Sequence, residues 1–445
     1  MNFKNWAVKV GSLLAISICT QVNSSGFALI EQSVSSLGNA YAGAGTSAYD
    51  ASVLYFNPAG MTKICGNQLV SGMHFIFPSS EFENNGSFQF LPPPNTPLTG
   101  GDGGNAGKFA AVPHFYAVSN WNDCVSYGIG INSPFGLATV YDGDWVGRYY
   151  ALKSAILSLN INPSIAYRIN DCLSIGAGFS AMYFDAELTN AIDFGSILFT
   201  VNPILADPQN LDGFAKLKGN SWGWGGNVGI LWDVTPCTRL GLSYRSQIKH
   251  HLRGNIVYDD VPDVLSSNGA FLNTDADAEI VLPDLVILSV YHTINSCFAV
   301  MADVSWTHWS LIQSLNIETE GSPAEIVTTL NWKDTWRCAV GLSYFPNQCM
   351  TYRVGFAFDE SPTPNSEYRS PRIPDQDRYW LTLGAGYVWN CIQFDAGYAH
   401  IFVPAARVDK TGFTDPTGED FFKGALRGKW DQHVNIFSVQ AAWNF

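Results

Sequence analysis

Hydrophobic and polar residues alternate along many short stretches of this chain. In the last nine residues, every second position is apolar or aromatic, and the series ends on Phe445. The same alternation recurs over 173–183, 379–389 and 392–399. Because successive side chains of a strand point to opposite faces, each stretch predicts a β-strand with one apolar face and one polar or glycine-rich face.

The connections between these stretches alternate in length. Short turns occur at 120–123, 170–171, 235–236, 295–296 and 346–348. Seven long segments rich in Gly, Pro, Asp and Asn separate them, near 79–108, 134–150, 188–218, 254–278, 310–330, 360–377 and 403–431. A soluble β-sandwich also alternates, but short turns on one side and long loops on the other are typical of a transmembrane barrel. The pattern predicts an all-β, antiparallel barrel of about 14 strands, with both termini on the short-turn side.

The composition favours the same class. Hydrophobic residues make up 47% of the chain and charged residues 14%, which is too apolar for a disordered protein. Beyond the N-terminus, no run of about 20 apolar residues predicts a helical membrane span. The net charge of −14, without any Lys/Arg cluster, excludes nucleic acid as a partner, because phosphate binding requires a concentrated basic surface.

The N-terminus has the pattern of a secretory signal peptide. Lys4 and Lys9 precede an apolar stretch, Val10 to Ile18, which is followed by small and polar residues. The apolar stretch is too short to cross a bilayer, although a membrane anchor is the alternative interpretation. We therefore expect three parts: a cleaved signal peptide (1–24), an N-terminal hatch (25–66) and the barrel (67–445).

Cysteines mark the short turns. Of the nine, Cys19 belongs to the signal peptide, Cys65 precedes the first strand and Cys338 is an exception to the pattern. The other six open an outgoing strand and share the lumen-facing parity: Cys124, Cys172, Cys237, Cys297, Cys349 and Cys391. Neighbouring short turns should lie about 10 Å apart, beyond the usual disulfide reach of about 7 Å. Two interpretations therefore stay open: disulfides, or free thiols at one repeated structural position. The spacing of the cysteines does not suit a metal site.

The segment Gly26 to Met61 is rich in Gly, Ala and Ser, and suits a plug in a wide barrel. It contains the runs GFAL, SLGNAYAG and NPAG. With DWVGRYYALKS, LNINPSIAYRIND and RIPDQDRYWLTLGAGY further on, it resembles the FadL/OMPP1/TodX family of outer-membrane transporters for long-chain fatty acids and aromatic hydrocarbons. The resemblance extends from about residue 26 to 445, although the loops at 79–108 and 188–218 match little.

The resemblance implies passive uptake of long-chain fatty acids across a bacterial outer membrane. The ligand would bind in a groove among external loops, move to a lumen pocket, and leave sideways through the wall beside a kinked third strand when the hatch moves. It also implies contact with outer-membrane lipids and recognition of Phe445 by the barrel-assembly machinery. No enzyme activity and no cofactor is expected.

Two sets of residues are candidates for this function. A fatty-acid pocket needs an apolar tube and a cationic end, and Arg suits a carboxylate. The substrate-binding candidates are Phe27, Leu29, Arg148, Lys153, Arg168, Arg245 and Arg353. The interior Asp303, Asp359 and Asp395 offer the same arginines alternative partners. The hatch and gate candidates are residues that form a turn, permit a bend in a strand or remove a backbone donor. They are Asn57, Pro58, Ala59, Gly128, Gly130 and Pro163.

Other functions remain as alternatives. The chain contains no GxSxG, HExxH, P-loop or EF-hand pattern. A lipolytic enzyme would require Ser, His and Asp to converge from distant strands. A transporter of aromatic hydrocarbons or other lipophiles, a structural or adhesive surface barrel, and an unplugged porin-like pore are the remaining alternatives.

Overall fold

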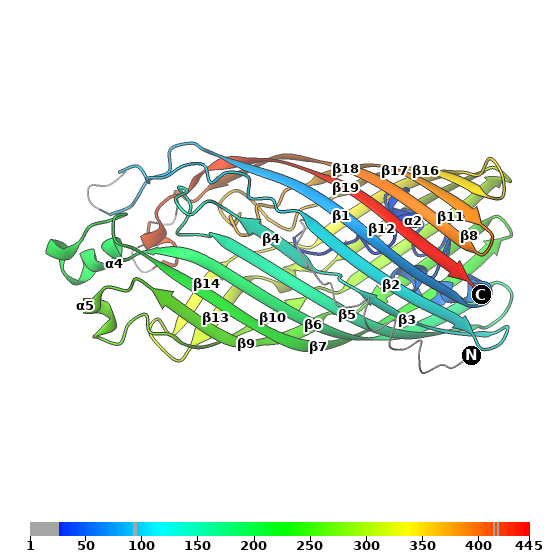
Figure 1. Cartoon of the computed structure of the whole chain (residues 1–445), viewed down its shortest axis with the longest axis horizontal. Coiled ribbons are helices and arrows are strands. Elements are labelled where there is room, and N and C mark those ends of the chain that lie inside the picture. The colour runs from blue at the N-terminus through cyan, green and yellow to red at the C-terminus, as the bar shows by residue number, and fades with distance from the viewer. Residues whose placement is uncertain (1–25, 92–95, 413, 416–417) are drawn as a thin grey trace.

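The wall of the protein is a single antiparallel β-sheet that closes on itself (Figure 1). In this computed structural model, residues 26–91, 96–412, 414–415 and 418–445 are described; the expected signal peptide, 1–24, lies outside them. β1 (Gln68–Asn84) pairs along its whole length with the last strand, β19 (Arg427–Asn444), and this ladder closes the barrel. Among the described residues, no helix is long and apolar enough to cross a membrane.

The sheet contains nineteen strands, of which five pairs are halves of an interrupted wall strand. The uninterrupted strands besides β1 and β19 are β2 (Ala110–Asn120), β5 (Lys153–Arg168), β6 (Leu173–Asp193), β7 (Asp212–Thr235), β16 (Met350–Asp359), β17 (Arg378–Trp389) and β18 (Ile392–Asp409). The interrupted strands are β3 (Val125–Asn132) with β4 (Gly136–Val140), β8 (Thr238–Arg245) with β9 (Ile248–Asp259), β10 (Thr274–Leu282) with β11 (Leu285–Asn295), β12 (Phe298–Thr307) with β13 (Ser314–Thr319), and β14 (Glu325–Thr329) with β15 (Thr335–Tyr344). Five joins reduce nineteen strands to fourteen, so the predicted strand number is confirmed.

The two ends of the barrel differ as expected. Short turns and the C-terminus lie at one end, and the long loops lie at the other with α4 (Phe194–Val201) and α5 (Asp263–Ser266) (Figure 1). Along β17, the side chains of Leu381 and Leu383 are about half exposed, whereas Thr382 is buried. The apolar side of each strand therefore faces outward, and the polar side faces the lumen.

Several strands continue beyond the predicted boundaries. β6 and β7 pair to their outermost residues, Asp193 and Asp212, although 188–218 was expected to be an irregular loop. Their outer positions there are charged, for example Glu187 and Lys218, which pair across the ladder. Once a strand leaves the hydrocarbon layer, both of its faces can be polar, and the alternation that marks it in the sequence disappears.

Asparagine side chains shape the short turns. The side-chain carbonyl of Asn170 accepts hydrogen bonds from the amides of Cys172 and Leu173 at 2.9 Å each, and Asn122, Asn295 and Asn347 repeat this arrangement. In these four turns the cysteine therefore occupies the same place. The eight cysteines that the structure describes are free thiols.

The N-terminal segment fills the lumen at the short-turn end. It contains the short helices α2 (Val34–Leu37), α3 (Val53–Phe56) and η1 (Pro58–Lys63), drawn in dark blue inside the barrel in Figure 1. Its apolar residues Leu37, Leu54 and Met61 pack in one cluster with Tyr116 and Trp380 of the wall. Residues 26–67 are thus a hatch held inside the barrel. The remaining short helices are η2 (Pro203–Leu205), η3 (Trp309–Leu311) and η4 (Phe421–Lys423).

Pro163 interrupts the β5–β6 ladder, and its neighbour repairs the interruption. The registered pairs run to Ile161–Ala181 and resume at Ser164–Gly178. Proline has no amide hydrogen to donate to the strand opposite. The side-chain amide of Asn162 instead donates to the carbonyl of Phe179 at 2.8 Å. The ladder therefore stays closed here, and Pro163 does not create a gap in the wall.

This arrangement predicts a specific stability loss. Asn162→Ala should lower the free energy of unfolding by about 1 to 3 kcal/mol, because the partly buried Phe179 carbonyl loses its donor. Asn162→Ala/Pro163→Ala should recover part of the loss, because an alanine in place of the proline supplies the missing backbone amide. Urea unfolding of the protein in detergent, followed by tryptophan fluorescence, measures both variants. Failure of the second substitution to recover any stability would contradict the explanation.

Candidate functional site

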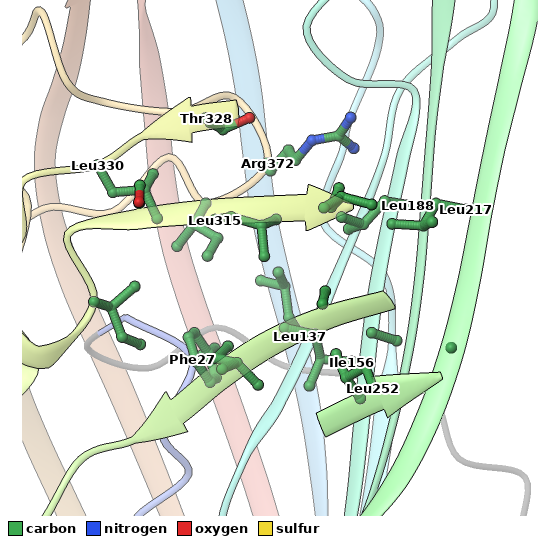
Figure 2. A pocket seen from close by; sticks show the side chains of 18 of the residues that line it. Phe27, Leu137, Ile156, Leu188, Leu217, Leu252, Leu315, Thr328, Leu330 and Arg372 are labelled. Carbon is green, nitrogen blue, oxygen red and sulfur yellow. The ribbon is translucent and has the colours of Figure 1, made fainter. Parts of the chain in front are cut away.

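Two connected cavities occupy the outer half of the lumen. One, of about 350 Å³, lies among the external loops and is lined by aromatic, aliphatic and charged side chains, including Tyr258, Phe271 and Lys423. The other, of about 90 Å³, lies deeper and is lined almost entirely by aliphatic and aromatic side chains (Figure 2). Both cavities share a set of lining residues, which are Leu188, Leu217, Leu315, Ile317, Thr328, Ser370 and Arg372. The shared lining makes them two parts of one path.

Phe27 of the hatch forms one end of the inner pocket. Its ring packs against Phe135, Trp309 and Trp332 at centroid distances of 5.8, 5.1 and 5.9 Å. The side chain is buried and lines the pocket. The other hatch candidate, Leu29, packs in the core cluster below and does not line either cavity.

Arg372 lies at the junction of the two cavities and lines both. Figure 2 shows it at the opposite end of the inner pocket from Phe27. Its guanidinium donates to the side chain of Asn190 at 3.0 Å and to the carbonyl of Thr189 at 3.2 Å. Within the described chain, no carboxylate forms a salt bridge with it. Burial lowers the pKa of Arg372 to about 10, so the guanidinium is still charged at neutral pH.

Arg372 is not among the substrate-binding residues predicted from the sequence. It belongs to the RIPDQDRYW stretch, but it lies in a loop, where alternation does not indicate which way a side chain points. The signal that was available is a lone cation between Pro371 and Ile373 in an otherwise apolar tripeptide. Its partners come from β5 and β6, more than 180 positions away along the chain.

The predicted lumen arginines contact the hatch rather than either cavity. Arg245 donates to the carbonyl of Tyr55 at 2.8 Å, and Arg168 donates to the carbonyl of Thr62. Arg353 forms a buried salt bridge with Asp395 at 2.8 Å and lies over the Tyr49 ring. None of these three lines the inner pocket or the outer cavity.

The two cationic candidates from GRYYALKS also have protein partners. Arg148 binds Asp212 at 2.7 Å and the carbonyl of Thr99 at 2.6 Å, which ties external loops together. Lys153 lies on the outer face of β5 and pairs with Glu187 at 2.8 Å. Its parity is outward because Ser154 and Ile156 are the buried positions of that strand. Neither side chain lines a cavity.

The third wall strand is interrupted beside the hatch. β3 ends at Asn132 and β4 begins at Gly136, while the β2–β3 ladder stops at Phe115–Ile131. The hatch fills the opening as a short extra strand. The Leu29 amide donates to the carbonyl of Pro134 at 2.7 Å, and the Gly136 amide donates to the carbonyl of Phe27 at 2.9 Å.

This interruption lies beyond the two glycines that were expected to bend the strand. Gly128 and Gly130 belong to a part of β3 that is paired with both β2 and β5. They provide room for the hatch instead: a Cβ atom at Gly128 would lie 2.8 Å from the Leu54 side chain. The break comes at Pro134, which has no amide to donate to a neighbouring strand.

The Asn57–Ala59 turn lies on another part of the wall. Asn57 caps η1 by accepting from the Ala59 amide at 3.1 Å, and it donates to the carbonyl of Ile230 at 3.0 Å. Pro58 and Ala59 contact the backbone of β6 and β7, where a Cβ atom at Gly176 or Gly229 would collide with them. The turn therefore faces these glycines and not the interruption in the third strand, which Phe27–Gln32 fills.

Glu31 is a buried carboxylate in the same hatch segment. It has no solvent exposure, and neither oxygen has a side-chain hydrogen-bond partner among the described residues. Burial raises the pKa of Glu31 to about 7, against the opposing influence of the Arg378 and Arg337 charges, while Asp359 adds to the rise. The segment that fills the wall opening thus contains a group that changes charge near neutral pH.

Comparison with known proteins gives a consistent result. Residues 15–445 match the family model described as outer membrane protein transport protein (OMPP1/FadL/TodX). A long-chain fatty acid transport protein of Salmonella typhi is 32% identical over 425 residues, covering 92% of this chain and 95% of that protein.

Two solved structures extend the comparison. The crystal structure of a Pseudomonas aeruginosa FadL homologue has a TM-score of 0.84 and 25% identity, and covers 94% of this chain and 100% of that one. The Pseudomonas putida toluene transporter TodX has a TM-score of 0.70 and 18% identity, and covers 95% and 100%. The second likeness shows the fold alone.

The close approach of the hatch turn to β7 is testable. Gly229→Ala should lower the midpoint of thermal unfolding and produce intermittent ion conductance in planar bilayers, because the added methyl displaces Asn57. Gly219→Ala is the matched control on the same strand, since its nearest atom would lie 3.4 Å away, an ordinary contact. Equal conductance and equal midpoints in the two variants would contradict the proposed fit.

The raised pKa of Glu31 predicts that the stability of the protein depends on pH. Its folded-state pKa lies above its ordinary value of 4.5, so its contribution to stability is fully present below about pH 4.5 and is lost as the pH rises through about 7. Glu31→Gln should remove this part of the slope and raise the unfolding midpoint at pH 8. Thermal unfolding between pH 5 and 8 measures it, with the exposed Glu81→Gln as control. A slope unchanged by Glu31→Gln would contradict the prediction.

Proposed function

The chain belongs to the outer membrane protein transport protein (OMPP1/FadL/TodX) family, and from this premise we propose that it takes up long-chain fatty acids passively. As a member it is an outer-membrane β-barrel that transports hydrophobic compounds. Relatives about 30% identical over most of the chain are long-chain fatty acid transport proteins. That similarity supports the substrate class, and the lumen supplies the argument for the anionic head group.

The observation that carries the proposal is the unpaired charge of Arg372. Arg353, Arg148 and Lys153 have acidic partners, and Arg245 and Arg168, which bind hatch carbonyls, line neither cavity. Arg372 has neutral partners and lies at the border between a mixed cavity and an apolar one. A carboxylate there would receive charge-assisted hydrogen bonds worth about 1.5 to 3 kcal/mol. The alkyl chain would extend toward Phe27.

The cavity volumes support a path with a closed inner end. Ligand sites usually measure about 300–1,000 Å³, and the outer cavity, about 350 Å³, falls in that range. The inner pocket, about 90 Å³, does not, so an alkyl chain needs Phe27 to move. Hydrophobic burial of the chain against Trp332 would drive this displacement, at about 0.8 kcal/mol for each buried CH₂.

Displacement of Phe27 would also loosen the hatch at the wall. The carbonyl of Phe27 accepts from the Gly136 amide, and two residues later Leu29 donates to Pro134. Moving Phe27 strains both bonds, which close the opening between β2 and β4. We propose that the ligand leaves through this opening into the membrane, so that its alkyl chain never crosses bulk water.

A second candidate substrate is an uncharged aromatic hydrocarbon. The nearly complete apolar lining of the inner pocket favours it, and the barrel shares its fold with the toluene transporter TodX. The two candidates differ in whether the charge of Arg372 matters. A fatty-acid transporter needs that charge, and a hydrocarbon transporter does not.

The test removes the charge of Arg372. Arg372→Gln should lower uptake of labelled oleate by about tenfold, the loss expected for one charge-assisted contact. Toluene uptake should be unchanged. The assay uses cells without their own outer-membrane fatty-acid transporter, and Arg427→Gln, an exposed external arginine, is the matched control. Arg372→Gln taking up oleate like wild type would contradict this role, and absence of oleate uptake by the folded wild type would contradict the substrate class.

A further inference from the structure

A second opening interrupts the wall between β10 and β13. β10 pairs with β13 through Ala276–Ala278 and Ile317–Thr319. The β11–β12 ladder begins at the pair Leu285–Thr307. Between these ladders, residues 279–283 face residues 309–316 without registered pairing in the described sheet. Residues 309–316 form hydrogen bonds on their side away from β10 instead. For example, the Gln313 carbonyl accepts from the Leu330 amide at 2.9 Å.

A groove of about 1,300 Å³ lies on the outer surface at this opening. Its rim is formed by outward-facing residues of β9, β10 and β13, including Arg253, Asp277, Glu279 and Glu318. Trp222 of β7 also lines it, with half of its surface exposed. Exposed tryptophans of a barrel belong to the girdle at the membrane–water interface. The groove therefore lies at the level of the outer-leaflet head groups, where lipophilic molecules partition.

The groove and the inner pocket share part of the wall. The residues that line both are Leu252, Asp277, Ala278, Ile280, Ile312 and Ser314. Leu252, Ala278 and Ile280 have lumen-facing parity, so the groove reaches through the opening to the lumen side of the strands. On one side of these residues the lining is charged and polar, and on the other it is apolar. A long-chain molecule lying across the opening would keep its polar end outside and its chain in the pocket.

We propose that the opening between β10 and β13 is a side entrance through which uncharged long-chain lipophiles pass from the outer leaflet into the inner pocket. The rim carries more acidic than basic groups: Asp275, Asp277, Glu279 and Glu318 against Arg253 and His251, while Lys249 beside the rim binds Glu279 at 2.6 Å. It repels a carboxylate anion and admits an alcohol or another neutral head group. Arg372, by contrast, lies on the path from the external loops.

This inference rests on the proposed uptake through the lumen pocket and adds a second class of substrate with its own entrance. Unpaired strand edges are tolerated at membrane depth only where they are covered or line a water-filled space. At the first opening the hatch bonds to the edge. At the second, the edge lines a polar groove at the interface, which leaves it accessible to a lipophile.

The experiment blocks the groove without filling the inner pocket. Val281→Trp/Asn316→Trp changes two residues that line the groove and not the pocket. The matched control, Leu288→Trp/Val340→Trp, changes two lipid-facing residues outside the groove. Uptake of labelled hexadecanol and labelled palmitate is compared in transporter-deficient cells, above the background of cells without the protein.

We expect the groove variant to lose hexadecanol uptake by about tenfold, as for a blocked route, while palmitate uptake stays equal to that of the control. Undiminished hexadecanol uptake would overturn the inference, and so would an equal loss of both substrates, which would locate the block in the shared lumen path. If wild type takes up hexadecanol but no palmitate, the proposed fatty-acid function fails while the side entrance stands. If it takes up neither, both fail.

Photolabelling of the unsubstituted protein guards against a variant that does not fold. A hexadecanol analogue with a diazirine beside the hydroxyl group, added to outer-membrane vesicles, should form adducts at residues 279–283 and 309–316. Adducts confined to the external loops and the hatch would overturn the side entrance.

Discussion

The structure depends on one requirement: a hatch with little regular secondary structure must satisfy its backbone polar groups inside the barrel. Buried carbonyls without partners are costly, and short helices leave many of them unpaired. The wall supplies the donors. Arg245, Arg337 and Arg239 donate to the carbonyls of Tyr55, Ala40 and Thr46 at 2.7–2.9 Å. Charged side chains in the lumen therefore serve first as anchors for the plug.

The same requirement explains the glycines of the wall. Where the hatch backbone reaches the sheet, a side chain would prevent contact, as at Gly355, where a Cβ atom would collide with the Asn39–Ala40 peptide. Arginine side chains bind hatch carbonyls that lie at a distance from the wall, and glycines leave room where the hatch backbone contacts the wall. The hatch fills the lumen at the short-turn end as a result, and the two cavities lie toward the external loops.

Much of the fold could be predicted from the sequence, because alternation and turn residues report local geometry. The fourteen strands, their direction and the inward parity of Arg245 and Arg353 follow from period-two patterns. The partners of those arginines do not, since a pattern along one strand cannot show whether a cation meets a ligand, a carboxylate or a hatch carbonyl. The wall interruption was expected at Gly128 and Gly130, but it depends on where the hatch pairs with Pro134, a contact between distant segments. The position of Arg372 could not be predicted either, because it also depends on contacts between distant segments.

The two wall openings illustrate how membrane depth decides what an open strand edge requires. The first lies among lipid-facing residues, Phe115 and Leu159, where unpaired amides would meet hydrocarbon. The hatch pairs with that edge, so any movement of the hatch exposes polar backbone to lipid and must be driven by a bound ligand. The second lies beside Trp222 and charged side chains, where water can satisfy the edge without any protein partner. In the proposed function the first opening acts as a gate that a ligand opens. The proposed side entrance needs no protein partner at its strand edge, and its selectivity would come from the charge of its rim.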